Sequence, residues 1–393
     1  SLMPTNLPVV AKKKWNEASQ ARTPQEKLEK LGEFLSLIPK HKGTEKLRAQ
    51  VKRQISTLRS EIEEKRRRRA GRGGPRFFLE KEGAAQIIIL GLTKVGRSSL
   101  LTSVTNAKTV VSDYPFTTRQ PVAGMLKFED LQFQLVEAPA VVEGAANISS
   151  GGMQTLGLAR NADGVILMVD LSQDAPKQLT MIFEELEKAR ILTQKPRARV
   201  EIERKHVGAG LRIIMFGKLL GCNLHDVENL LKGYRILDAT VKIHGEASLD
   251  DVEDAIFEST IYRPAIIVAN KADLPEAEGA LNQLKQFVGD QLPIIPVSVH
   301  AGAGLKNLGA EIFKALDIIR VYTKEPNDRE PSSNPFILKR GSTVADLAKQ
   351  IHSDFIEKFA HARVWATRLT FSPRKVGPSF VLEDKDVVEL HTR

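Results

Sequence analysis

The stretch Gly91-Leu92-Thr93-Lys94-Val95-Gly96-Arg97-Ser98 lies between an apolar, strand-like run at residues 86–90 and a helix-like segment at residues 98–105. Glycines at its first and sixth positions permit the tight turn that brings backbone N–H groups close to phosphate oxygens. The positive end of the following helix adds to this attraction. The pattern is typical of a phosphate-binding P-loop, except that Arg97 stands where a Lys is usual.

The exchange at Arg97 concerns the phosphates directly. A Lys at this position reaches the β and γ phosphates as a compact charge, whereas Arg is larger and planar, so affinity or catalysis would change. The residues that we predict to bind phosphate are Gly91, Lys94, Val95, Gly96, Arg97, Ser98 and Ser99.

A second loop predicts the base. The apolar run 265–268 is followed by Asn270-Lys271-Ala272-Asp273. An Asp carboxylate can accept hydrogen bonds from N1–H and the 2-amino group of guanine, whereas adenine has an acceptor at N1. We therefore expect guanine at Asp273, with Lys271 over the ring and Asn270 tying this loop to the P-loop.

A third apolar run, 294–297, leads into Ser298-Val299-His300, whose backbone N–H groups we expect to meet guanine O6. Three loops, each after a strand and before a helix, predict ligand binding at the carboxyl ends of a parallel sheet. The expected fold class is α/β, a P-loop NTPase domain with a mostly parallel sheet and helices on both faces. The alternative is that these loops are ordinary strand-to-helix turns.

The segment 113–118 is polar and turn-prone and precedes a strand-like run at 124–128. A Thr hydroxyl in this segment would complete the shell of a Mg²⁺ ion together with Ser98. We predict Thr118 for this role, with Thr117 as second choice.

The next strand-like run, 132–136, leads into Glu137-Ala138-Pro139-Ala140, where GTP hydrolases usually have Asp-x-x-Gly. Glu137 would still hold a Mg²⁺-bound water, with an altered reach. Ala140 keeps the N–H that would meet the γ-phosphate, but its β-carbon forbids the backbone angles that only glycine adopts. Arg97, Thr118, Glu137 and Ala140 are the candidate catalytic residues.

Composition limits the class of protein. The 393 residues predict two to four domains. No apolar run approaches the roughly 20 residues that span a membrane, so no membrane association is expected. The one cysteine, Cys222, excludes an internal disulfide and fits a reducing cytoplasm, which is the predicted location.

The positive charge is concentrated near the N-terminus. The net charge is +10, and residues 40–76 hold fourteen Lys or Arg against four Glu. They follow Thr23-Pro24-Gln25-Glu26, which predicts a helix start, and contain a second amphipathic helix that ends in Arg66-Arg67-Arg68-Arg69. A glycine-rich stretch to Gly74 follows. Such a basic arm predicts contact with RNA or a ribosome, without DNA specificity; the alternative is a solvated helix end.

Three stretches together carry a resemblance to a known family: residues 114–118, Glu143-Gly144-Ala145 and Asn270-Lys271-Ala272-Asp273. The chain resembles the developmentally regulated GTP-binding (DRG) subfamily of the Obg GTPase superfamily. The resemblance implies a helical hairpin and basic arm at 1–83 and a G domain at 84–320. It also implies an inserted ribosomal-S5-like α/β domain at 196–262 and a C-terminal β-grasp TGS domain at 321–393.

The resemblance also implies GTP or GDP and Mg²⁺ as ligands, slow GTP hydrolysis that Val141 fits, and a role at the ribosome in translation, with a regulatory partner protein. The family has Lys at Arg97 and Asp-x-Pro-Gly at residues 137–140, so we expect weakened turnover. A non-hydrolysing scaffold and a degenerate domain that only supports RNA binding are the alternatives. Potassium-dependent relatives have Asn at Lys94; the ammonium there could replace K⁺ or point into solvent.

The remaining expectations concern the insertion and the tail. In the insertion, residues 219–231 and 250–257 are expected to be helical. In the tail, 334–338 and 380–382 read as strands and 343–359 as a helix. Trp365 is expected either to stack on RNA or to belong to the core.

Overall fold

The structure is a computed structural model that describes residues 7–40, 42–70, 79–105, 110–111, 121–144, 152–234, 236–257, 260–351 and 358–392. These residues form two units, which we describe separately. The first unit holds the described residues of 79–189 and 263–392, and the second holds those of 7–70 and 190–262.

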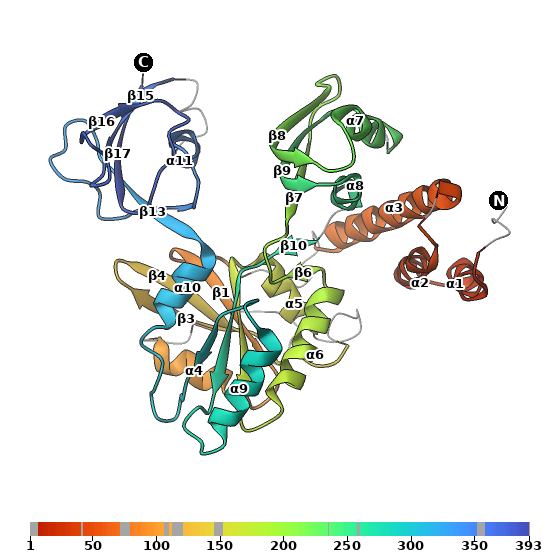
Figure 1. Cartoon of the computed structure of the whole chain (residues 1–393), viewed down its shortest axis with the longest axis horizontal. Coiled ribbons are helices and arrows are strands. Elements are labelled where there is room, and N and C mark those ends of the chain that lie inside the picture. The colour runs from red at the N-terminus through yellow and green to blue at the C-terminus, as the bar shows by residue number, and fades with distance from the viewer. Residues whose placement is uncertain are drawn as a thin grey trace. The chain divides into compact units, whose positions relative to one another are not determined.

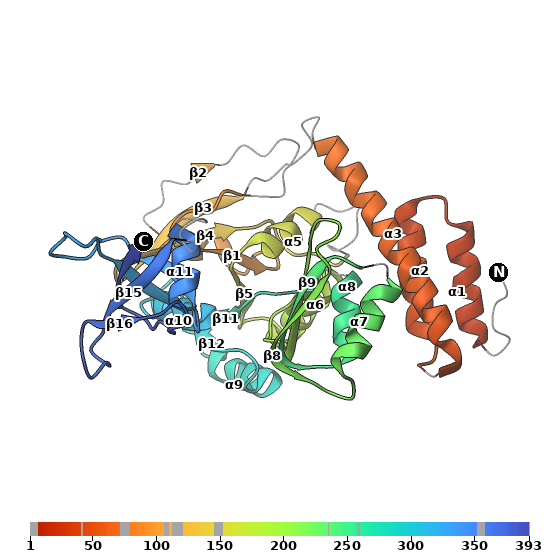
Figure 2. The same cartoon turned by 90° about the horizontal axis from the view of Figure 1, so that it is seen from above.

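A seven-stranded sheet forms the centre of the first unit, in the order β12-β11-β5-β1-β4-β3-β2 (Figure 2). The strands from β12 to β4 are parallel, β3 is antiparallel to β4, and β2 is antiparallel to β3. Every residue of β1, β5 and β11 is buried, as expected for strands covered on both faces. The strands are β1 Ala85–Gly91, β2 Val110–Val111, β3 Val122–Phe128, β4 Leu131–Glu137, β5 Gly164–Asp170, β11 Ala265–Asn270 and β12 Ile294–Pro296.

Helices cover both faces of this sheet (Figure 1). On one face lie α4 (Arg97–Val104) and α10 (Leu308–Leu316), and on the other lie α5 (Gly152–Asn161) and α6 (Ala175–Lys188). Helix α9 (Ala277–Val288) packs against α6. The predicted α/β class with a mostly parallel sheet is confirmed.

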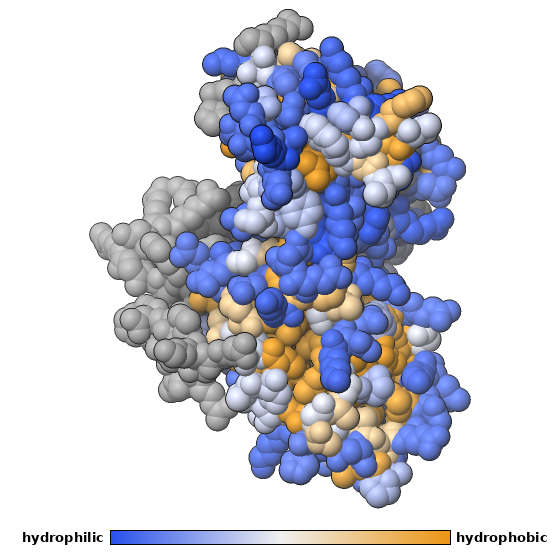
Figure 3. Space-filling model, turned by 90° about the vertical axis from the view of Figure 1, so that its left-hand side faces the viewer, coloured by the Kyte–Doolittle hydropathy of each residue, from blue (hydrophilic) through white to orange (hydrophobic). Residues whose placement is uncertain are grey.

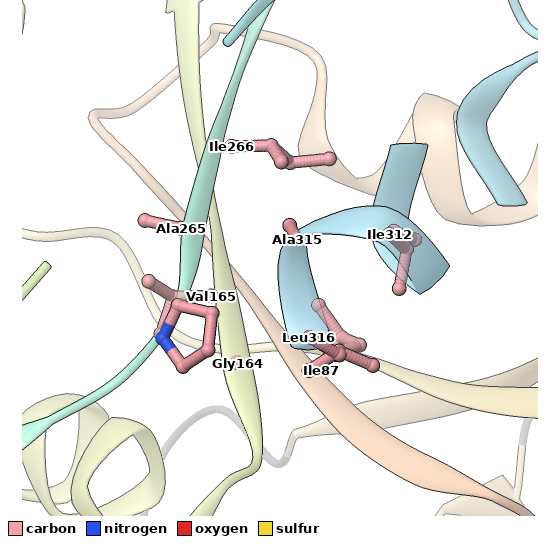
Figure 4. A pocket seen from close by; sticks show the side chains of 9 residues that line it. Ile87, Gly164, Val165, Ala265, Ile266, Ile312, Ala315 and Leu316 are labelled. Carbon is pink, nitrogen blue, oxygen red and sulfur yellow. The ribbon is translucent and has the colours of Figure 1, made fainter. Parts of the chain in front are cut away.

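A small pocket lies at the amino-terminal edge of the sheet, where β5 and β11 begin and α10 ends (Figure 4). Aliphatic residues, Gly164 and Pro264 line it, without a charged or hydroxyl-bearing side chain. A ligand site needs a few polar groups to orient its ligand. The pocket is therefore a gap in core packing rather than a candidate site.

The C-terminal part of the first unit is a five-stranded sheet, in the order β14-β13-β17-β15-β16, with helix α11 (Val344–Ile351) packed on it. Only the β13–β17 pair is parallel. In Figure 3 this C-terminal part is at the top of the face turned toward the viewer, and the surface there is mostly hydrophilic. The strands are β13 Ile318–Thr323, β14 Phe336–Lys339, β15 Phe359–Trp365, β16 Arg374–Val376 and β17 Asp386–Thr392.

The second unit begins with the helices α1 (Val9–Gln20), α2 (Pro24–Leu37) and α3 (Glu45–Ala70), the last preceded by the short helix η1 (Lys42–Thr44). Figure 2 shows the three long helices side by side. The Thr23 side chain caps α2 by accepting a hydrogen bond from the Glu26 N–H at 3.1 Å. The expected start of this helix is therefore confirmed.

Helix α1 was not predicted from the sequence. Its buried residues are Ala11 and Ala18, and Trp15 packs on Phe34 with ring centroids 5.2 Å apart. Alanine marks an apolar face weakly, and three lysines in this helix obscure it further.

The inserted segment of the second unit is a three-stranded sheet, in the order β7-β9-β8, with two helices. The short parallel pair β6 (Ile191–Leu192) and β10 (Ile261–Tyr262) lies where the chain enters and leaves it. Its other elements are β7 Ala198–Arg204, β8 Leu211–Leu219, β9 Ala239–Ala247, α7 Leu224–Gly233 and α8 Leu249–Phe257.

Two expected helix boundaries and one expected strand are wrong. Residue 219 ends β8, and α7 begins only after Asn223, whose side chain and that of Asp226 form a reciprocal cap. Residues 380–382 form a single bridge between Val381 and Thr343 instead of a strand. Phe359 begins β15, so the helix expected to extend to it ends earlier.

Candidate nucleotide-binding site

The loop between β1 and α4 has the glycine-dependent geometry expected of a phosphate-binding loop. Gly96 is in the left-handed region, at φ 100°, and a β-carbon on it would lie 2.6 Å from the Asn270 side-chain nitrogen. A β-carbon on Gly91 would lie 2.9 Å from the carbonyl oxygen of Met168. Both positions therefore require glycine.

Asn270 joins the three predicted loops. Its side-chain amide donates to the carbonyl of Val95 at 3.0 Å, and its side-chain oxygen accepts from the N–H of Val299 at 3.1 Å. Asn270 itself is buried at the end of β11. One side chain thus fixes the spacing of the P-loop, the 270–273 loop and the 298–300 loop.

A cavity of about 590 Å³ lies between these loops. Nearly all of the residues predicted to bind phosphate or base line it, together with Thr102 and Ser103, which the sequence analysis did not select. The lining residues are Lys94, Val95, Gly96, Ser98, Ser99, Thr102, Ser103, Asn270, Lys271, Asp273, Ser298, Val299 and His300.

The ammonium of Lys271 is held by a residue that sequence reasoning missed. The Lys271 ammonium lies 2.7 Å from a carboxylate oxygen of Asp170, which is buried at the end of β5. Burial would raise the pKa of Asp170, but hydrogen bonds from Lys271 and Ser172 outweigh it, and the pKa is lowered. The sequence offered one sign of this role: Asp170 ends the apolar run of β5, at the carboxyl edge of the sheet where the ligand is expected.

Two of the predicted catalytic residues, Arg97 and Glu137, form contacts between the first turn of α4 and the end of β4. The Ser98 hydroxyl donates to Glu137 at 2.6 Å, and the Arg97 guanidinium donates to the carbonyl of Ala138. Arg97 is buried and is not among the residues that line the cavity. Ala140 follows β4 and is half-buried.

Oxygen donors suit Mg²⁺; Ser98, which lines the cavity, supplies a hydroxyl, and Glu137 supplies a carboxylate 2.6 Å from it. These residues fit the ion. Thr117 and Thr118, the other predicted ligands, lie outside the described residues. Among the residues that are described, no cluster of three or more His, Cys, Asp or Glu could hold a metal ion.

Comparisons with protein families match three regions of the chain. Residues 86–201 match the model described as a 50S ribosome-binding GTPase. Residues 209–318 match the C-terminal region of the MMR_HSR1 domain, and residues 319–392 match the TGS domain.

Whole-length relatives agree. An uncharacterized GTP-binding protein of Methanocaldococcus jannaschii is 30% identical over 378 residues, which cover 96% of this chain and 95% of the relative. Developmentally-regulated GTP-binding protein 2 of Mus musculus is 28% identical over 369 residues, which cover 93% of this chain and 98% of the relative. The chain belongs to the DRG family of GTP-binding proteins. Developmentally-regulated G-protein 3 of Arabidopsis thaliana, another member, is 29% identical over 374 residues.

Membership in the DRG family identifies the seven-stranded domain as a GTPase domain and the five-stranded domain as the TGS domain. Within the described part of this DRG protein, no helix has the length and apolar character needed to cross a membrane. The roles of individual site residues toward nucleotide stay predictions.

Proposed function

We propose that this DRG protein binds GTP and GDP at the cavity between β1, β11 and β12, with Mg²⁺ near Ser98, and that it hydrolyses GTP slowly. The observation that carries the proposal is the position of Asp273, which lines the cavity beside the loop that Asn270 joins to the P-loop. A carboxylate in this place suits guanine and rejects adenine. Ser298, Val299 and His300 line the same cavity and support the assignment.

Nucleotide titration tests this function. We expect GDP and GTP to bind to the unmodified protein and ATP to bind far more weakly. A turnover assay with and without K⁺ then measures hydrolysis and its cation dependence. Equal affinity for ATP and GTP would contradict the proposed guanine site.

The altered catalytic loops support weak turnover, and the competing function is a GTP-binding scaffold that does not hydrolyse. The Ser98 hydroxyl donates a hydrogen bond to Glu137, and the Arg97 guanidinium donates to the carbonyl of Ala138. The first contact must break before the Ser98 hydroxyl can bind Mg²⁺, and the second before Arg97 can bind a γ-phosphate. From its place in the segment before β3, Thr118 is proposed as the second hydroxyl ligand of Mg²⁺.

The triple variant Arg97→Lys, Glu137→Asp, Ala140→Gly is expected to hydrolyse GTP faster than the unmodified protein. Restoring one preorganised charge contact is worth about 3 kcal/mol in the transition state, which corresponds to roughly a hundredfold in rate. Single-turnover hydrolysis measures the effect, and Arg97→Lys alone serves as the control. If the unmodified protein already turns over as fast as the triple variant, its loops are not weakened.

We also propose that the protein acts in the cytoplasm with RNA or the ribosome, in translation, and that a regulatory partner protein assists it. The family description "50S ribosome-binding GTPase" and the basic run at the end of α3 support this. The proposed domain limits are 1–83, 84–320 with an insertion at 196–262, and 321–393.

Replacing the four arginines Arg66, Arg67, Arg68 and Arg69 with Gln is expected to weaken RNA or ribosome binding. They belong to α3, so Gln is chosen because it is a good helix former without charge. Each phosphate contact contributes about 0.7 to 0.9 to the slope of log affinity against log salt, so the slope should flatten by roughly three. Sedimentation with ribosomes over a salt series measures it.

The matched control removes four exposed charges outside the arm: Lys285, Lys306, Lys314 and Arg329, each replaced with Gln. We expect this control to keep the slope of the unmodified protein. An unchanged slope in the arginine variant would contradict RNA binding by the arm. The TGS domain would then be the candidate RNA contact, with Trp365 and Lys324, whose ammonium lies 4.6 Å from the Trp365 ring centroid.

A further inference from the structure

Two cationic residues, Lys94 in the loop between β1 and α4 and Arg97 at the start of α4, differ in exposure: Lys94 is exposed and Arg97 is buried. Arg97 is only 8% exposed, and its guanidinium donates to the carbonyl of Ala138. Its stem packs under the loop, because a β-carbon on Gly91 would lie 3.2 Å from the Arg97 Cδ. The side chain is thus committed to the segment that follows β4.

Lys94 has the opposite environment. It is exposed, it lines the 590 Å³ cavity, and its φ of 64° lies in the left-handed region. Among the described residues it forms no ion pair and no side-chain hydrogen bond. Lys271, the other lysine of the cavity, is held by Asp170 at 2.7 Å.

The contacts of Arg97 bear on where it can act. To reach a phosphate, its guanidinium would have to leave a buried carbonyl without a donor, which is unfavourable. The Lys94 ammonium has no such partner to leave, and its flexible four-carbon stem lets it follow a phosphate. A diphosphate placed over the start of α4 therefore meets Lys94 at lower cost than Arg97.

We propose that Lys94 supplies the charge that neutralises the phosphates of the bound nucleotide in this protein. Arg97 is then a positioning residue that holds Ala138 and fixes the loop after β4. Two further backbone contacts define this loop: Ala138 N–H donates to the carbonyl of Ile89 at 3.4 Å, and Val141 N–H donates to that of Gly91 at 2.9 Å. The inference rests on the proposed nucleotide site and specifies which cation serves it.

The test compares ligands that share the base and differ in phosphate: guanosine, GMP and GDP. In Lys94→Gln we expect the affinity for GDP to fall about tenfold while that for guanosine is kept, because one charge contact near the surface is lost. Lys94→Arg, which keeps the charge, should restore most of the preference for GDP over guanosine.

In Arg97→Met the preference for GDP over guanosine should change by less than about threefold. Amide hydrogen exchange at Ala138 and Val141 should instead become faster, an effect that Lys94→Gln lacks. If Arg97→Met does not fold, Arg97→Gln tests the same preference for GDP over guanosine, since its side-chain amide can still donate to the carbonyl of Ala138 but carries no charge.

The proposal is overturned if Lys94→Gln keeps the full GDP preference, or if the Arg97 variants lose it tenfold. Failure of the proposed function gives a different result: the unmodified protein would then bind GDP no better than ADP, whatever stands at position 94. The two failures are thus distinguishable in one set of titrations.

Discussion

Asp273→Asn is expected to move the base preference from guanine to xanthine nucleotides. The carboxylate of Asp273 accepts from two donors of guanine, and Asn offers one donor in place of an acceptor, which matches the carbonyl of xanthine. Two hydrogen bonds to a charged acceptor are worth about 1.5 to 3 kcal/mol each, so GDP affinity should fall by at least about a hundredfold. Competition titrations with GDP and xanthosine diphosphate measure the change.

The variant should fold, because Asp273 is exposed and, in the part of the chain that the structure describes, has no ion pair or side-chain hydrogen bond. Asp290→Asn is the matched control: it is also exposed, but it lies after α9 and does not line the cavity. Undiminished GDP binding by Asp273→Asn would remove Asp273 from the base site.

The framework of the site was predictable from the sequence because it depends on local pattern. Gly91 ends a strand and Gly96 precedes a helix, and Asn270 ends a run of buried residues that has the pattern of a strand. The loops then meet because the carboxyl ends of parallel strands lie at one edge of a sheet. Even the amide contact from Asn270 to Val95 follows from this arrangement.

The partners of the charged side chains could not be predicted from the sequence, because these contacts join residues far apart in the chain. Arg97 pairs with a carbonyl 41 residues later, and Lys271 with a carboxylate 101 residues earlier. Sequence spacing gives no measure of such contacts. The sequence therefore suggested both Lys94 and Arg97 as phosphate-binding residues, whereas in the structure Lys94 lines the cavity and Arg97 is buried outside it.

A second large effect is expected at Arg320, which joins the GTPase domain to the TGS domain. Its side chain on β13 is 3% exposed and contacts three carboxylates: Glu129 at 2.6 Å, Asp130 at 2.7 Å and Asp384 at 3.1 Å. Glu129 and Asp130 form the turn between β3 and β4, whereas Asp384 precedes β17. One guanidinium thus ties the tip of the GTPase hairpin to the TGS sheet.

The position of that hairpin gives the contact a wider consequence. Strand β3 follows the segment that contains Thr118, and β4 ends at Glu137, so the hairpin connects both predicted γ-phosphate loops. The Arg320 guanidinium also lies 5.1 Å from the Phe313 ring centroid of α10, and Phe313 lies 5.5 Å from Phe128 of β3. Any shift of the hairpin on nucleotide exchange would reach the TGS domain through this cluster.

Arg320→Met should lower the free energy of unfolding by about 2 to 3 kcal/mol. Removing one partner of a buried ion pair costs about 3 to 5 kcal/mol, and the carboxylates here are partly exposed, which reduces the loss. Denaturant unfolding followed by tryptophan fluorescence measures it. In a Trp15→Phe background, Trp365 of the TGS domain is the only tryptophan. Arg340→Met is the control, since its pair with Asp317 is more than half exposed and should be worth little.

The same contact makes a prediction about pH. Burial would raise the pKa of Asp130, but hydrogen bonds from Tyr322 and Arg320 outweigh it and hold the pKa below the ordinary value of 3.8. A carboxyl with a depressed folded-state pKa stabilises the fold above its unfolded pKa, and this contribution is lost as the pH falls through the folded pKa. As the pH falls below about 5 and on through this depressed pKa, the unmodified protein should therefore lose more stability than Arg320→Met. Parallel losses in the two proteins would show that Arg320 does not hold Asp130 ionised, and the link between the hairpin and the TGS domain would then rest on other contacts, such as the hydrogen bond that the Tyr322 hydroxyl donates to Asp130.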